Sequence, residues 1–152
     1  MYAFVDRPVE SLGNGGRFLL WAMRGWVHAC EHGRCPPRVL HRGFAAVDVQ
    51  GALADFHVAL ALLAGDTVRP LMLAPIPCGQ ISEHEAILLG LWRDFSLGEA
   101  AKARATLALL ADGDSVGAIA KAMEAATGHL VAAGFELPAL AAGAMTCQES
   151  SK

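Results

Sequence analysis

The stretch that decides the fold class is residues 17–31, which read RFLLWAMRGWVHACE. At 100° per residue, its charged and histidine side chains fall within one stripe about 60° wide. Nearly every other position is apolar or small, and a helix with so narrow a polar side is packed over most of its circumference. We therefore predict that residues 17–31 form the central helix of a helical domain.

The composition of the whole chain supports an all-α fold. Its 152 residues are 54% hydrophobic and 18% charged. Ala and Leu are the two commonest residues and the strongest helix formers, whereas the β-branched residues typical of strands are fewer. We predict one domain over residues 1–152, a compact bundle of five or six helices, with flexible ends at 1–13 and 138–152.

Prolines and glycines set the helix boundaries in the first half of the chain. The two prolines at 36–37 end the first helix, and a short helix follows over residues 38–46. Asp48 is expected to begin the next helix, which ends at Gly65. Residues 66–80 contain three prolines and predict a proline-rich loop without helical character.

Capping sequences set the helix boundaries in the second half. Ser82–Glu85 and Ser96–Glu99 both read S-x-x-E, the pattern of a reciprocal capping box, so each is expected to begin a helix. Asp114 or Ser115 caps the last helix. The side of this helix opposite its apolar stripe carries Ala118, Ala122, Ala125, Gly128 and Ala132. Small residues permit close approach, so this side is a candidate contact with another helix or with a second subunit. An exposed face chosen for helix propensity is an equal alternative.

Positive charge is concentrated in the first third of the chain. The segment from Arg17 to Arg42 contains five arginines and one glutamate, although the whole chain has a net charge of −3. Such a segment attracts an anion or an acidic partner, and the alternative is an ordinary solvated helix face. The candidate residues for binding an anion or partner are Arg17, Arg24, Arg38 and Arg42.

Histidines and cysteines gather in the same segment. His28 and His32 are four residues apart and share one side of a helix, and imidazole and thiolate are the ligands that zinc prefers. The candidate metal ligands are His28, His32, Cys35 and Cys78, with zinc as the candidate cofactor. The spacing of Cys30 and Cys35 matches no common zinc module, so the alternative is buried thiols beside solvent-facing histidines.

Residues 81–101 carry a second pattern, ISxxExxLLxL followed by SxxEAA. It resembles the opening half of the LuxR-type helix-turn-helix module, and the resemblance implies a DNA-binding regulator. Residues 105–111, where the recognition helix should follow, read ATLALLA and contain no Arg, Lys, Asn or Gln to reach base edges. The sequence therefore favours shared capping signals over a nucleic-acid partner.

Catalytic motifs are absent from the sequence, which contains no Walker A, HExxH or GxSxG pattern. Cys78 precedes the helix that begins after Ser82, and His84 nearby is a candidate base for its thiol. The only nearby carboxylates that could orient His84 are two glutamates in the first turn of that helix, where the helix dipole and the cap already account for them. We therefore favour a non-enzymatic protein-association module that forms a homodimer. The first alternative is a small-ligand or metal-binding protein that uses residues 28–42 with Cys78, and the second is the DNA-binding regulator.

No run of about 18 uncharged apolar residues occurs, so we expect no membrane span. Residues 1–10 lack the basic stretch and apolar core of a signal peptide, and the expected compartment is the cytoplasm.

Overall fold

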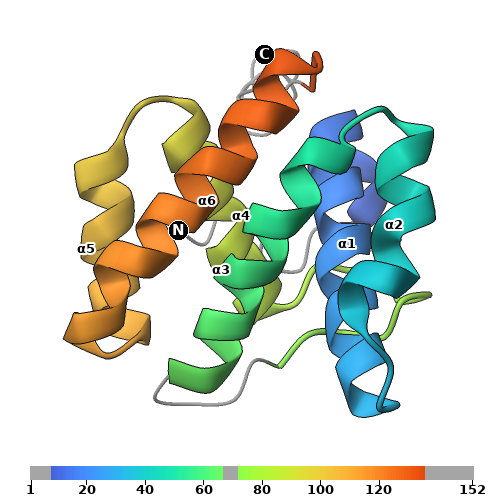
Figure 1. The fold of residues 1–152 in the computed structure, drawn as a ribbon, viewed down its shortest axis with the longest axis horizontal. Helices are drawn as coiled ribbons and strands as arrows, with labels where there is room; N and C mark the ends of the chain where they lie inside the picture. The colour runs from blue at the N-terminus through green and yellow to red at the C-terminus, as the bar shows by residue number, and fades with distance from the viewer. Residues whose placement is uncertain (1–7, 67–71, 136–152) are drawn as a thin grey trace, which may run out of the picture.

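The computed structural model describes residues 8–66 and 72–135, which form an all-α bundle of six helices without strands (Figure 1). This confirms the predicted fold class. The helices are α1 (Asn14–Glu31), α2 (Pro36–Ala46), α3 (Leu53–Asp66), α4 (Glu83–Ser96), α5 (Ala100–Leu110) and α6 (Gly113–Ala132), with short 3-10 turns η1 (Val9–Ser11) and η2 (Gln50–Ala52). The predicted flexible end at 138–152 and residues 1–7 of the predicted flexible start lie outside the described residues.

The sequence predicted that α1 is the central helix, but in the structure α6 packs more extensively against the other helices than α1 does. α6 packs against α3, α4, α5 and η2, whereas α1 packs mainly against α2 and also contacts α3 and α4. In Figure 1, α1 and α2 therefore lie together at the side of the bundle opposite α5. Ten residues of α1 are buried, which confirms that this helix is packed over most of its circumference. Trp21 on α1 packs against α2 at Gly43 and remains 38% exposed. No helix in this part of the chain is long and apolar enough to cross a membrane.

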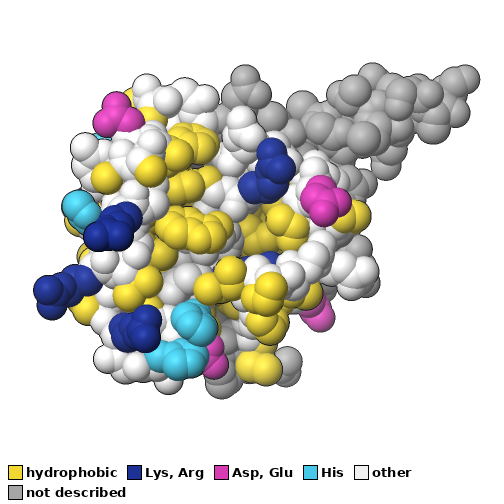
Figure 2. All heavy atoms as spheres, turned by 90° about the vertical axis from the view of Figure 1, so that its right-hand side faces the viewer, with side chains coloured by type: hydrophobic (Ala, Val, Ile, Leu, Met, Phe, Trp, Pro, Cys, Tyr) yellow, Lys and Arg dark blue, Asp and Glu magenta, His cyan; other side chains and the backbone are white. Residues whose placement is uncertain are grey.

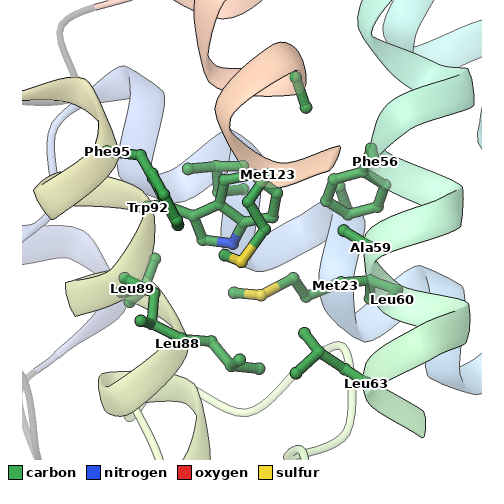
Figure 3. Packing of buried hydrophobic residues seen from close by; sticks show 14 of the residues in the cluster. Met23, Phe56, Ala59, Leu60, Leu63, Leu88, Leu89, Trp92, Phe95 and Met123 are labelled. Atoms are coloured by element: carbon green, nitrogen blue, oxygen red, sulfur yellow. The ribbon is translucent and has the colours of Figure 1, made fainter. Parts of the chain in front are cut away.

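The main core lies where α1, α3, α4 and α6 meet, and Figure 3 shows side chains from these four helices pointing toward one another. Met23, Phe56, Trp92 and Met123 are at most 1% exposed. The rings of Phe56 and Trp92 are stacked with their centroids 5.7 Å apart. This burial of large apolar side chains is the main stabilising contribution to the fold.

One of the two predicted capping boxes is present. The Glu85 backbone N–H donates to Ser82 Oγ at 3.4 Å, and the Ser82 backbone N–H donates to Glu85 Oε1 at 2.9 Å. The prediction at Ser96 was wrong, because Ser96 belongs to α4 and its hydroxyl donates to the Arg93 carbonyl at 2.6 Å. Gly98, with φ +76°, ends α4 in a Schellman motif, which leaves α5 to begin only at Ala100.

The predicted helix start at Asp48 was also wrong. Asp48 has φ +63° and its backbone N–H donates to the Ala45 carbonyl, while the Val49 N–H donates to the Phe44 carbonyl. These two bonds are again a Schellman motif, which closes α2 instead of beginning α3. Asp tolerates the left-handed conformation better than most residues, and the buried Val49 fixes the turn against the core.

Candidate functional site

A buried ion pair between α1 and α4 organises the side of the molecule where α1 and α2 lie. Arg24, in the middle of α1, is 4% exposed, and Glu85, in the first turn of α4, is fully buried. Arg24 Nε donates to Glu85 Oε2 at 2.7 Å, and Arg24 Nη2 donates to Glu85 Oε1 at 2.9 Å. The contact is bidentate, which is the strongest and most directional form of this pair.

The remaining N–H groups of Arg24 hold the loop that precedes α4. Nη1 donates to the carbonyls of Ile76 at 3.3 Å and Cys78 at 2.7 Å, and Nη2 donates to the carbonyl of Gln80 at 2.8 Å. The guanidinium has five N–H donors, and all five are used inside the fold. Arg24 therefore has no donor left for an external anion, and we exclude it from the binding residues considered below.

Glu85 is equally well satisfied. Its Oε2 also accepts from the Ala74 backbone N–H at 3.0 Å, and its Oε1 accepts the capping bond from Ser82. Each carboxylate oxygen thus accepts two hydrogen bonds, and together with Arg24 they bind the loop over residues 74–82 at five backbone positions. The sequence analysis identified Glu85 only as a capping residue. The signal for its second role was Arg24, the one charged residue in an apolar stretch of the first helix.

Beside this loop, α1 and α2 form an exposed surface that we call the α1–α2 face. Its apolar members are Trp21, Val39, Met72 and Ile76, and its basic members are Arg17, Arg34, Arg38, Arg42, His28 and His32. Figure 2 looks onto this side of the molecule and shows hydrophobic side chains across its middle, with Lys, Arg and His side chains around them and a few Asp or Glu side chains toward its margins. The face therefore combines apolar and positively charged groups.

Trp21 is the largest exposed apolar side chain of the α1–α2 face. Its indole lies directly on α2 at Gly43, where an added methyl group would overlap the ring. Its other ring neighbour is Phe18, with centroids 5.8 Å apart. Val39 precedes Gly43 by one helical turn and is 43% exposed, so it continues the apolar surface along α2.

The arginines of the α1–α2 face are not neutralised by acidic neighbours. Arg34, Arg38 and Arg42 are exposed, and none has a carboxylate oxygen within 4.0 Å among the described residues. Arg17 donates a hydrogen bond to the neutral side-chain amide of Asn14, with 3.1 Å between Nη2 and Oδ1. Of the four predicted anion-binding or partner-binding residues, the structure leaves Arg17, Arg38 and Arg42 accessible and commits Arg24 to Glu85.

The predicted metal ligands are brought together only in part. The rings of His28 and His32 lie side by side at the end of α1, with their centroids 4.1 Å apart and a tilt of 38° between the planes. Cys35 is exposed at the start of α2, and the Cys78 thiol lies 3.5 Å from the Gln80 carbonyl in the loop. Across residues 8–66 and 72–135, no three or more His, Cys, Asp or Glu side chains are grouped so as to hold a metal ion.

The cysteines do not form a catalytic arrangement in the described part of the chain. Burial, and secondly the charge of Glu31, raise the pKa of the Cys30 thiol, so Cys30 is protonated at neutral pH. His84, the candidate base for Cys78, instead accepts a hydrogen bond from the Met72 backbone N–H at 2.9 Å.

The stretch at 81–101 that resembles a helix-turn-helix module forms α4 and the first two residues of α5, and residues 105–110 lie further along α5. The exposed side of α5 includes Ala101, Ala105, Ala108 and Leu109 beside the two basic residues Lys102 and Arg104. This side offers few groups that could contact phosphates or bases. Comparisons of the chain with protein-family models, with curated proteins and with solved structures found no match.

The Arg24–Glu85 pair predicts a large loss of stability when one partner is removed. Arg24→Ala should lower the free energy of unfolding by about 3–5 kcal/mol, because the Glu85 charge would remain buried without compensation. Arg17→Ala, a change to an exposed arginine on the same helix, should alter it by no more than about 0.5 kcal/mol. Urea denaturation followed by circular dichroism measures both values, and similar losses in the two variants would contradict the role assigned to Arg24.

Proposed function

We propose that this domain is a non-enzymatic protein-association module whose α1–α2 face binds an acidic segment of a partner protein. The observation that carries the proposal is the position of Trp21, an exposed tryptophan on the same face as arginines that have no carboxylate oxygen within 4.0 Å among the described residues. Trp and Arg are the residue types that contribute most to binding energy at protein interfaces. On the α1–α2 face they occur together on a helix pair that is already packed against the core.

Charge determines the kind of partner. Arg38 and Arg42 are one helical turn apart on α2, with Arg34 just before the helix begins, and each guanidinium can take a carboxylate in a bidentate contact. A partner with carboxylates beside an apolar side chain would supply the missing negative charge and cover Trp21. A symmetric contact between two copies of this face would instead place arginines against arginines, which is unfavourable.

The loop makes the face rigid before a partner binds. Arg24 holds the carbonyls of Ile76, Cys78 and Gln80, so the backbone that carries the exposed Ile76 side chain is fixed against α1. A surface that is ordered in advance loses less conformational entropy on binding than a flexible one. The buried ion pair thus supports the proposed function without contacting the partner.

A synthetic peptide tests the proposal. A fluorescently labelled amphipathic peptide of Glu and Leu should bind the wild-type domain and perturb the NMR signals of α1 and α2, and its affinity should fall as salt is added. Trp21→Ala should weaken binding by about tenfold or more, as expected for a central aromatic anchor. The double variant Arg38→Glu with Arg42→Glu should also weaken it, because it reverses two of the attracting charges.

The matched controls are a peptide and a variant. The same peptide with Lys in place of Glu should not bind, and Arg104→Glu, an exposed arginine on α5, should bind the Glu peptide like the wild-type domain. The proposal is contradicted if the wild-type domain does not bind the Glu peptide. It is also contradicted if Trp21→Ala binds with unchanged affinity, or if Arg104→Glu has as large an effect as the double variant.

A second candidate function is the homodimer expected from the sequence, formed through α6. Ala118, Ala125 and Ala132 are exposed along this helix, whereas Ala122 is buried in the domain's own core. Lys121 and Glu124 are exposed between these alanines, and neither has an ion-pair partner among the described residues. Two antiparallel copies of α6 would bring Lys121 of one copy toward Glu124 of the other, so this side is self-complementary.

Size-exclusion chromatography with light scattering tests the homodimer. The wild-type chain should elute as a dimer at micromolar concentration, and Ala125→Arg should make it monomeric by placing a bulky charge in the contact. Ala105→Arg, at an exposed alanine of α5, is the matched control and should remain dimeric. A wild-type monomer at this concentration excludes the homodimer and leaves the acidic partner as the only candidate.

A further inference from the structure

The C-terminal end of α1 presents two imidazoles to solvent at metal-binding spacing. His28 lies in the last turn of α1 and His32 is the residue that caps this helix, so the two are four positions apart. Both side chains are exposed, and their ring centroids are 4.1 Å apart with an angle of 38° between the planes. This separation places both rings within reach of one ion at the ordinary Zn–N bond length of about 2.0–2.1 Å.

One hydrogen bond indicates which tautomer the neutral His32 ring adopts. Its Nδ1 lies 2.9 Å from the backbone carbonyl oxygen of His28. A carbonyl oxygen only accepts hydrogen bonds, so Nδ1 carries the proton and the lone pair of the neutral ring is at Nε2. A histidine that binds a metal is typically oriented in this way, with its other ring N–H donating to a carbonyl or carboxylate.

We infer that His28 and His32 form a binding site for one divalent transition-metal ion of the zinc class, with water in the remaining positions. Neutral imidazole suits zinc, copper and nickel and does not suit magnesium or calcium, which prefer oxygen ligands. The inference differs from the expected four-ligand site, because the described structure groups neither Cys35 nor Cys78 with the two histidines. It does not depend on the proposed partner binding.

The charged residues nearest to the pair in sequence add no net positive charge to it. Arg24, one turn before His28, is neutralised by its bidentate contact with Glu85. Glu31, between the two histidines in sequence, is exposed and contributes negative charge, whereas Arg34, two residues after His32, contributes positive charge. The charges adjacent to the pair in sequence thus balance, and binding depends on the imidazole nitrogens themselves.

Titration of the full chain with ZnCl₂ tests the site by calorimetry and by the NMR signals of the histidine rings. The wild-type protein should bind one Zn²⁺, and the rings of His28 and His32 should shift together. His28→Gln and His32→Gln should each weaken binding by about tenfold or more, because each removes one of two protein ligands. MgCl₂ should produce no binding, since imidazole is a poor ligand for Mg²⁺.

Three variants distinguish this site from other sources of zinc affinity. His41→Gln, at an exposed histidine of α2, and Cys35→Ser should both bind Zn²⁺ like the wild-type protein. Trp21→Ala should also retain full zinc affinity, so that failure of the metal site and failure of the proposed partner binding are separately visible. The inference is overturned if the wild-type chain binds no Zn²⁺, if both glutamine variants bind unchanged, or if Cys35→Ser loses as much affinity as His28→Gln.

Discussion

The interaction on which the rest of this structure depends is the buried pair of Arg24 and Glu85. Two opposite charges removed from water cost several kcal/mol unless the geometry and the surrounding hydrogen bonds compensate. Here every N–H of the guanidinium and both oxygens of the carboxylate are satisfied, partly by each other and partly by backbone groups of the loop. The loop before α4 contains two prolines and few regular hydrogen bonds of its own. The ion pair therefore holds its backbone in place against α1 and the start of α4.

This one constraint also shapes the surface. Along α1, Arg24 points into the protein, whereas Trp21 before it and His28 after it are on the exposed α1–α2 face. The same helix thus supplies the internal anchor, the main apolar contact and one of the two imidazoles. Within the described residues, four of the nine exposed large hydrophobic side chains belong to this face and its loop. The high hydrophobic content of the chain is therefore partly a property of its surface.

Local sequence patterns predicted most of the fold. Apolar periodicity identified α1, and the Ser82–Glu85 pattern identified the start of α4, because both signals depend on neighbours within one or two helical turns. The wrong boundaries at Asp48 and Ser96 have a common cause. Each lies at a helix end closed by a Schellman motif, and the left-handed residue of that motif decides where the helix stops.

The candidate site could be predicted less well, because its members come from distant parts of the chain. Arg24 and Glu85 are 61 residues apart, and no local pattern indicates which carboxylate an isolated arginine will meet. Periodicity placed Arg24 on the polar side of the first helix and could not show that the loop covers that position. The exposure of Trp21 was missed for a similar reason, since whether an aromatic residue at helical spacing is covered depends on the helices around it.

Amide hydrogen exchange at Ala74 tests the central role of the ion pair most directly. The Ala74 N–H lies in a loop and donates to the Glu85 carboxylate. If the Arg24–Glu85 pair organises the loop, this amide should exchange about as slowly as the amides of α4, because both open only when the pair is broken. Exchange at the rate of an unstructured peptide, with α4 still protected, would show that the loop is not held by this pair.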